Sequence, residues 1–462
     1  MERTSEIKLH TCGNATLIIE KNDKPIVATD PWLHYHTAYF GSWATTYKIP
    51  DFHMNLLEKV PYIWISHFHP DHLNLRSLLK IKARKKKILL SYQYSNRMAN
   101  DLKNAGLDVI ILPARNYITL DGDIKLASFP ILNTVDSGLI IKCKNNVIVN
   151  LNDTLCDPSK HFLKKEISKS KNSLLLKLAG YGDADMINIF DQKNNFIEPI
   201  ASSKPAPGFL LTAQARNINC THAMHFSSFH QYVRSDSLWA NKYTTPRSDL
   251  RRGWNKNIGY FEEFSSLLIN ENGFQKINSN YPEVNNIKIK EPIEHGDYWD
   301  QDLKSNEFKL VKDYLNTIEE ISKNSFLIKV GSQIIESDIK LSRFKRSQKL
   351  ILHAPRKSLI KAIKLNIFDD LLIGNFARLI IPDNNNVNYR NLLKIPSKYI
   401  DNIGIKNAND LKEFLWIYRN SYDSKSVQLR SEIIQKLRDL TISKLKGRNK
   451  ILGKLKQIYQ RF

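Results

Sequence analysis

Four side chains that commonly bind metals stand within six residues of one another: His67, His69, Asp71 and His72. They follow an apolar segment, YIWIS, which has the pattern of a buried strand. Residues two apart at a strand end project the same way, and a turn at Pro70 followed by a helix from about Asp71 would bring the other two ligands to the same place. Nitrogen and carboxylate ligands suit zinc or iron, so we predict one or two cation sites. A water molecule at an open position on such a metal has its pKa lowered to about 7.

Strands and helices alternate through the first 155 residues and must position this cluster. Two pairs of strands are predicted to form hairpins, one around residues 21–24 and one around residues 145–146. Helical spacing of apolar residues marks Leu73–Ala83 and Asn96–Ala105. Hairpins combined with strand–helix units predict an α/β domain with helices outside a mixed sheet. The predicted strands are Asn14–Glu20, Pro25–Asp30, Tyr62–His67, Lys86–Tyr92, Asp108–Pro113, Ile124–Leu132, Gly138–Lys144 and Val147–Asp153.

The rest of the chain is expected to hold further domains, because single cores rarely exceed about 300 residues. Residues 164–280 have an irregular, aromatic-rich pattern, and Asn, Pro, Glu and Asp accumulate at residues 275–305. We therefore predict a metal domain at 1–290, a smaller α/β extension at 291–405 and a basic helical tail at 406–462. Within the extension, residues 302–323 are predicted to be helical and residues 325–352 strand-like. The tail has eleven Lys or Arg against two acids between Lys425 and Arg461.

Charge and cysteine content bear on the environment and the partners of the protein. The net charge of +23 favours anions, which include phosphorylated or carboxylated small molecules, nucleic acid and anionic lipid. A biased composition with a solvated basic surface explains the same number equally well. The four cysteines are scattered without a CxxC pair, which indicates core residues in a reducing compartment. With no long apolar stretch and no leader-like start, the prediction is a cytoplasmic protein.

The HxHxDH pattern after an apolar strand resembles the signature of the metallo-β-lactamase superfamily. The segments CGNATLIIE and VATDPWL resemble the branch with lactonase-like and N-acyl-phosphatidylethanolamine phospholipase-like members. A closer resemblance is to the metallo-β-lactamase part of the CMP-N-acetylneuraminate hydroxylase family, whose order TDPW, FGSW and IWISHFHPDHL follow. DSGLIIKCKNNVIVNLNDT and IFDDLLIGNFARL extend this resemblance to about residue 385. The resemblance implies an αββα sandwich as the fold, followed by a smaller α/β extension and terminal basic helices. The cysteines lack the Rieske pattern that carries electrons in that hydroxylase family.

The resemblance also implies roles for residues outside the cluster. Asp153 matches a carboxylate that bridges two metals and takes part in catalysis, with a helix-capping aspartate as the alternative. The late histidine ligand corresponds to His230, with His225 as the second choice. Asp30 resembles an aspartate that orients a ligand imidazole, although a plain turn residue before proline is the alternative.

One superfamily ligand has no histidine counterpart in this chain. No histidine occurs between His72 and His161, where the superfamily has one before the DSGL-type strand. Either Asp136 or Asn133 takes its place, or a single metal is bound tightly. A carboxylate at this position would favour iron over zinc.

Three functions are compatible with the sequence. The leading hypothesis is a metal-dependent hydrolase that uses activated water on an anionic substrate, with Asp71 as the proton acceptor. The substrate would be bound by Arg247, Arg251 and Arg252, unless these simply face solvent. The second hypothesis is an iron- and O2-dependent hydroxylase of a sugar nucleotide, which would need a separate electron donor. The third is a nuclease of the same superfamily, although nucleic acid is the less favoured partner. The basic tail would also allow peripheral membrane contact.

Overall fold

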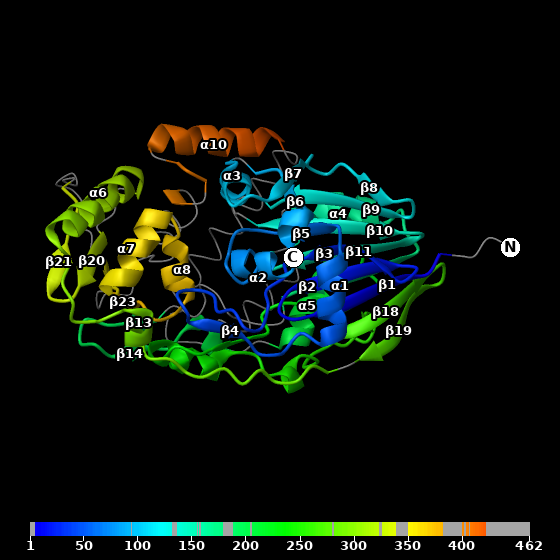
Figure 1. Cartoon of the computed structure of the whole chain (residues 1–462), viewed down its shortest axis with the longest axis horizontal. Coiled ribbons are helices and arrows are strands. Elements are labelled where there is room, and N and C mark those ends of the chain that lie inside the picture. Colours follow the sequence, from blue (N-terminus) through cyan, green and yellow to red (C-terminus); the bar gives the residue numbers. More distant parts are fainter. Residues whose placement is uncertain are drawn as a thin grey trace.

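Two facing β-sheets with helices on both outer sides form the larger part of the molecule. The computed structural model describes residues 5–93, 95–131, 136–154, 156, 159–178, 188–203, 206–279, 281–322, 326–338, 350–381, 400–401, 403–405 and 407–421. Alternating apolar side chains let each strand bury one face between the sheets and the other under helices. In Figure 1 this sandwich lies on the right and a second α/β unit lies on the left.

The first sheet combines the N-terminal hairpin with parallel strands and a late hairpin. It consists of β1 (Ile7–Cys12), β2 (Thr16–Lys21), β3 (Lys24–Thr29), β5 (Tyr62–Ile65), β6 (Lys87–Ser91), β7 (Asp108–Leu112), β18 (Ser265–Asn270) and β19 (Gly273–Ser279). Their order across the sheet is β19-β18-β1-β2-β3-β5-β6-β7. β3, β5, β6 and β7 run parallel, so their carboxyl ends meet at one edge. The loop that carries the histidine cluster leaves from this edge, directly after β5.

The second sheet has a similar mixture of antiparallel and parallel strands. It consists of β8 (Ile118–Asp121), β9 (Ile124–Pro130), β10 (Ser137–Cys143), β11 (Asn146–Asn152), β12 (Asn172–Lys177), β15 (His222–His225) and β17 (Gly259–Tyr260). Their order is β17-β15-β12-β11-β10-β9-β8. Both predicted hairpins are confirmed, because β2 pairs antiparallel with β3 and β10 pairs antiparallel with β11.

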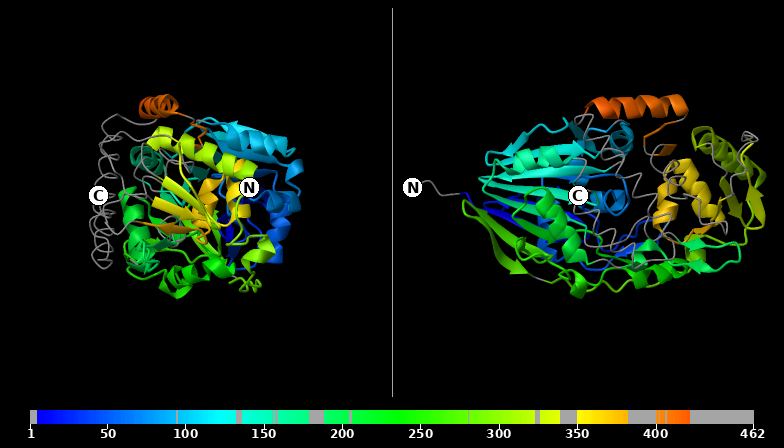
Figure 2. Two further views of the ribbon diagram at one scale, coloured as in Figure 1. Left: turned by 90° about the vertical axis from the view of Figure 1, so that its left-hand side faces the viewer. Right: turned by 180° about the vertical axis from the view of Figure 1, so that it is seen from behind.

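Apolar side chains from the two sheets share one core, and this core defines the layers. Leu17 and Trp64 of the first sheet pack with Leu139 and Leu174 of the second, all of them fully buried. Helices α1 (Asp51–Lys59), α2 (Leu75–Lys80) and α3 (Arg97–Asn104) cover the outer face of the first sheet. Helices α4 (Lys160–Ile167) and α5 (Pro207–Asn217) cover the outer face of the second. The order of layers is therefore helix, sheet, sheet, helix, which is the predicted αββα sandwich (Figure 2).

A third sheet with its own core forms the second unit, which we call the C-terminal module. Its strands are β13 (Ile189–Phe190), β14 (Phe196–Ile197), β20 (Phe326–Val330), β21 (Gln333–Ile335), β22 (Leu350–His353) and β23 (Arg378–Ile380). Helices α6 (Ser305–Ser322), α7 (Arg356–Leu365) and α8 (Phe368–Ile373) pack on it through buried side chains such as Leu315, Leu359 and Leu371. β13 pairs with β23, so this sheet also recruits a segment from well before residue 290. The predicted domain boundaries at residues 290 and 405 stay predictions.

Several segments differ from the sequence-based expectations. Residues 164–280, expected to be irregular, include α5, β15, β18, β19 and the short strand β16 (His230–Tyr232), which pairs with β4 (Trp43–Thr45). Short elements of this kind are hard to predict because each holds too few residues to show a period. The four cysteines are buried and form no disulfide, as expected for core residues. Helix α10 (Ala408–Ser421) begins the predicted tail, whose remaining residues 422–462 lie outside the described part.

Among the described residues, no helix is long and apolar enough to cross a membrane.

Candidate metal centre

The loop after β5 carries the four clustered ligands at the edge where the parallel strands end. A tight turn brings the backbone N–H of His72 to the carbonyl of His69 at 2.9 Å. Helix α2 starts only at Leu75, because the side chain of Asn74 caps it by accepting the N–H of Ser77 at 3.0 Å. The prediction that the helix begins near Asp71 was wrong by about one turn, because this cap sets the start. Asp71 and His72 therefore project from the turn rather than from the helix.

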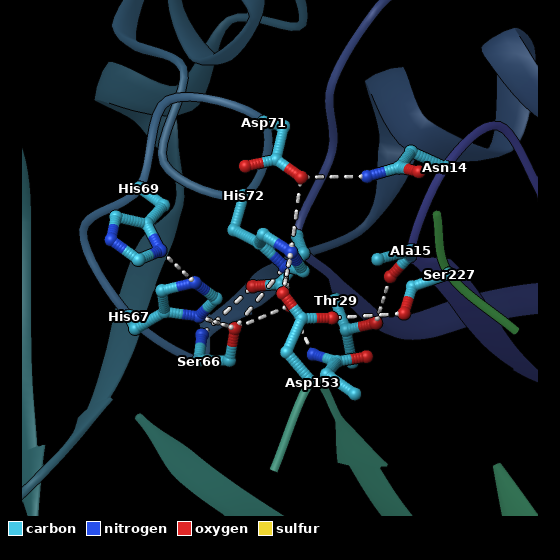
Figure 3. A network of polar contacts seen from close by, with 12 residues as sticks. Asn14, Ala15, Thr29, Ser66, His67, His69, Asp71, His72, Asp153 and Ser227 are labelled. Atoms are coloured by element: carbon cyan, nitrogen blue, oxygen red, sulfur yellow. Dashed lines mark hydrogen bonds and ion pairs between the residues drawn. The ribbon is translucent and has the colours of Figure 1, made fainter. Parts of the chain in front are cut away.

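Two groups of potential ligand atoms lie side by side in this turn, and they share one imidazole. His67, His72 and Asp153 each offer one atom within 4.8 Å of the others, and so do His67, His69 and Asp136. Asp153 follows β11, so the centre is built from strand ends of both sheets. Figure 3 shows His67 and His69 on one side and His72 between Asp71 and Asp153 on the other.

Asp30 lies behind the histidines and fixes their orientation through a set of short hydrogen bonds. One of its carboxylate oxygens accepts the backbone N–H of Ser66 at 2.8 Å, and the other accepts the Ser66 hydroxyl at 2.7 Å and the Asn152 amide at 2.6 Å. The second oxygen also lies 3.0 Å from Nδ1 of His72. The Ser66 hydroxyl in turn lies 2.9 Å from Nδ1 of His67. Both imidazoles therefore turn Nε2 toward the centre.

The electrostatics of the buried histidines differ according to their neighbours. Burial and the adjacent His72 and His69 lower the pKa of His67 to about 3, so its ring is neutral. Burial also opposes the charging of His72, but Asp71 and Asp153 outweigh it and raise the pKa of His72 well above its usual value. Nε2 of His72 lies 3.3 Å from an oxygen of each of these carboxylates. Two carboxylates that converge on one imidazole attract positive charge to this point.

Asp71 is held by donors on both of its oxygens. The phenol of Tyr39 donates a hydrogen bond to Oδ1 at 2.5 Å, and the amide of Asn14 donates to Oδ2 at 3.0 Å. Burial disfavours its charge, yet the neighbouring His72 outweighs this effect and lowers the pKa of Asp71 to about 2. Asp71 is therefore an ionised, firmly oriented carboxylate at neutral pH.

The two candidates for the late histidine ligand have different surroundings. His230 stacks on Trp43 with ring centroids 3.5 Å apart, and neither of its ring nitrogens has a hydrogen-bond partner among the described residues. Burial lowers the pKa of His230 to about 4, although the negative charges of Asp71 and Asp153 act against this shift. By contrast, Nε2 of His225 lies 3.0 Å from the carbonyl oxygen of Leu250. Of the two, His230 is the one on which the charges of Asp71 and Asp153 act, and it has both nitrogens available.

Two aspartates of α8, which sequence reasoning did not assign to the site, approach it from the C-terminal module. Asp369 lies with Oδ2 3.0 Å from Nε2 of His69. The carboxyl of Asp370 is buried, and its Oδ1 has no hydrogen-bond partner within the described part of the chain. Burial and the charge of Asp369 raise the pKa of Asp370 to about 8, although His69 opposes this shift. The only sequence signal was the DD pair in IFDDLLIGNFARL, 300 positions from the histidines.

The three predicted substrate arginines have other contacts. Arg247 forms an ion pair with Glu263 and lies over the ring of Tyr281. Arg252 pairs with Asp249 at 2.6 Å, and Arg251 lies over the ring of Tyr260. None of these contacts reaches the histidine cluster. Asn133, one of the two proposed replacements for the missing histidine, lies outside those residues, whereas Asp136 is described and lies 3.9 Å from Nε2 of His67.

The donor set fits a cation site on its own chemistry. Nε2 of His67 and Nδ1 of His69 face each other at 3.0 Å, with the oxygens of Asp136 beside them. Each of these imidazoles has its other nitrogen engaged by an oxygen, as is usual for metal-binding histidines. The unpartnered nitrogens of His230 add a further potential ligand. Imidazole and carboxylate ligands in this number suit zinc or iron.

No protein-family model and no curated protein matches this chain. Among solved structures, the isothiocyanate hydrolase from Delia radicum gut bacteria is similar at 13% identity and a TM-score of 0.38, over 56% of this chain and 98% of the other. The metallo-β-lactamase fold protein YhfI from Bacillus subtilis matches at 11% identity and a TM-score of 0.34, over 57% of this chain and 99% of the other. CmlA, a diiron β-hydroxylase from Streptomyces venezuelae, matches at 15% identity and a TM-score of 0.33, over 49% of this chain. The chain spans only 45% of the length of CmlA.

Proposed function

We propose that the protein is a metal-dependent hydrolase that uses activated water to cleave an anionic, phosphate- or carboxylate-bearing substrate. The observation that carries this proposal is the pair of adjacent ligand groups that share His67. The first cation position would be formed by His67, His69 and Asp136. The second would be formed by His72 and Asp153 of the other group, with Asp71 and His230 beside them.

Cations held in these positions would lower the pKa of a bound water to about 7 and polarise the bond that is cleaved. The residues of the chain then have separate tasks. Asp71 accepts the proton released by the attacking water, since it is ionised and oriented by Tyr39 and Asn14. Asp153 has a side chain that is 33% exposed, so substrate would approach from its side of the centre. Ser227 keeps this carboxylate in place by donating a hydrogen bond to Oδ1 at 3.0 Å.

Preference for an anion is supported by the charge of the whole protein. A net charge of +23 raises the local concentration of anionic molecules around the molecule. Arg247, Arg251 and Arg252 are the proposed substrate contacts, and a substrate that uses them must compete with Glu263 and Asp249 for the first and last of these.

A second function, oxygen-dependent hydroxylation at an iron centre, is favoured by the number of carboxylates. Asp136 stands where a histidine was expected, and Asp71, Asp153, Asp369 and Asp370 lie around the same imidazoles. Carboxylate ligands favour harder cations such as iron. In this case the substrate would be a sugar nucleotide or a similar anion, and a separate protein would supply the electrons.

Metal analysis combined with activity assays distinguishes these functions. The purified protein is analysed for zinc and iron, then assayed on bis(p-nitrophenyl) phosphate and on p-nitrophenyl phosphate with and without oxygen. Hydrolysis without oxygen that is lost in His67→Ala and Asp71→Asn, but kept in the exposed-site control His161→Ala, supports the first proposal. Iron together with O2 uptake in the presence of a reduced ferredoxin supports the second. Failure to bind either metal would overturn both.

A further inference from the structure

In both imidazoles of the first cation position, the nitrogen that faces away from the centre lies within hydrogen-bond distance of an oxygen atom. The two oxygens come from different parts of the molecule. For His67 it is the hydroxyl of Ser66, the adjacent residue, held in turn by Asp30. For His69 it is the carboxylate of Asp369, which belongs to α8 of the C-terminal module. One side of the predicted metal centre is therefore completed by the C-terminal module.

The direction of the His69 ring depends on this contact. Its Nε2 lies 3.0 Å from Oδ2 of Asp369, while its Nδ1 faces Nε2 of His67 at 3.0 Å. When Nε2–H donates to the carboxylate, Nδ1 keeps its lone pair turned toward the cation position. A flipped ring would present a carbon or the wrong nitrogen there. Both side chains are largely shielded from water, with 15% of His69 and 18% of Asp369 exposed, so solvent competes weakly for this bond.

Helix α8 is held at both ends, by its own module at the start and by residues of the larger unit at the end. At its start, the backbone N–H of Phe368 donates to Asp401 at 2.6 Å. At its end, the hydroxyl of Ser42 donates to the carbonyl of Gly374 at 2.6 Å, and the indole of Trp239 donates to the carbonyl of Asn375 at 3.0 Å. These bonds hold the helix in a defined register, which places Asp369 against His69.

We propose that Asp369 is a positioning residue of the metal centre, which holds His69 with Nδ1 directed at the first cation position. The C-terminal module thereby completes a site whose other residues come from the sandwich. This inference rests on the metal centre of the proposed function. The neighbouring Asp370 has a buried oxygen without a hydrogen-bond partner in the described residues, whereas Asp369 contacts His69 directly, so the role falls to Asp369.

Cobalt titration of the full-length, metal-stripped protein tests the proposal, with Co2+ absorption reporting how many ions bind and how tightly. Asp369→Ala should weaken one of two binding steps by about 10- to 100-fold, as is usual when the partner of a metal-binding histidine is removed. Asp369→Asn keeps an oxygen that accepts from Nε2 and should lose less. Asp313→Ala, which removes an exposed acid of α6 in the same module, is the charge-matched control and should bind as the parent does.

A second measurement separates positioning from simple loss of folding. Long-range 1H–15N NMR of the zinc-loaded protein should show His69 bound through Nδ1 with a proton on Nε2, and this signature should be lost or mixed in Asp369→Ala. Unchanged cobalt affinity in Asp369→Ala, or binding of His69 through Nε2 in the parent, would overturn the proposal while leaving the metal centre intact. If the parent protein bound no cobalt, the proposed function itself would fail.

Discussion

At the scale of single residues, the centre is built from imidazoles whose two nitrogens have different partners. His67 and His72 are oriented from behind by Ser66 and Asp30, and His69 is oriented by Asp369. Neutral imidazole is the form that binds a cation, and burial keeps His67 in that form by lowering its pKa to about 3. His67 is therefore ready for a metal, whereas His69 and His72, whose burial is outweighed by neighbouring carboxylates that raise their pKa values, must release a proton when a cation binds.

Asp136 is the residue that most directly tests the first cation position. Asp136→Ala should reduce affinity for one of the two ions by more than about 100-fold. Removing a ligand weakens metal binding more than removing a residue that only hydrogen-bonds to a ligand, which costs about 10- to 100-fold. Asp136→His, which restores the residue expected from the superfamily pattern, should retain two ions and shift the preference from iron toward zinc. Elemental analysis after loading with equal zinc and iron measures both effects. Two tightly bound ions in Asp136→Ala would show that this carboxylate is not a ligand.

The residues of the centre were predictable to different degrees. His67, His69, Asp71 and His72 stand together in the sequence, so their spacing alone indicated a site. Asp153 and His230 required a family resemblance, because nothing local distinguishes them from capping or core residues. Asp369 could not be predicted, since its contact with His69 depends on how two separate units pack.

At the scale of elements, the strands were predictable where apolar runs were bounded by turn residues. β6, β7 and β9 begin within one residue of the predicted starts, and all three lie within the predicted ranges. Elements with mixed composition were missed, and α1 is the clearest case. It begins after Pro50 and contains Phe52, His53 and Asn55, whose residue types do not produce a clear helical stripe.

Helix α1 also carries a buried histidine that should make the fold sensitive to acid. Neither ring nitrogen of His53 has a hydrogen-bond partner in the described part of the chain, and burial lowers its pKa to about 4. The unfolded chain takes up a proton near pH 6.5 whereas the folded chain does not, so stability is complete above pH 6.5 and is lost as the pH falls toward 4. His53 can lower the free energy of unfolding by at most about 3 kcal/mol, because each unit of difference between its pKa in the unfolded and the folded chain corresponds to about 1.36 kcal/mol.

Replacement of this histidine by a residue that does not titrate should remove its share of the acid sensitivity. His53→Leu should lose less stability between pH 7 and pH 5 than the parent, as measured by urea unfolding at each pH. His10, whose ring centroid is 5.6 Å away, also has a pKa lowered to about 4, so part of the sensitivity should remain. His161→Gln changes an exposed histidine on α4, and its free energy of unfolding should fall between pH 7 and pH 5 by as much as that of the parent. An equal fall for His53→Leu and the parent would contradict this assignment.

At the scale of the whole molecule, a strongly basic protein surrounds an acidic centre. The net charge is +23, yet the side chains around the histidines are the carboxylates of Asp30, Asp71, Asp136, Asp153, Asp369 and Asp370. The exterior attracts anions over long distances, while the centre attracts cations at short range. Under the proposed function, metal binding would reduce the local negative charge, and we therefore expect an anionic substrate to bind only to the metal-loaded protein.

The two units of the molecule are joined by a guanidinium, and its removal should affect both stability and the metal centre. Arg97 of α3 donates hydrogen bonds to the carbonyls of Leu365 at 2.7 Å, Asn366 at 2.6 Å and Asp401 at 2.7 Å, all in the C-terminal module. Because a charged hydrogen bond contributes about 1.5–3 kcal/mol, Arg97→Ala should destabilise the protein by about 2–4 kcal/mol in urea unfolding. Arg97→Lys should recover only part of this, since one ammonium lacks the planar fork that reaches several carbonyls at once. Arg76→Ala removes an exposed arginine of α2 and should leave stability within about 0.5 kcal/mol of the parent.

The same substitution should also affect the metal centre, because α8 directly follows the carbonyls that Arg97 holds. In Arg97→Ala, hydrogen exchange at residues 368–373 should become faster and the affinity for cobalt should fall. Faster exchange without any loss of affinity would show that the site does not depend on how firmly the module is docked.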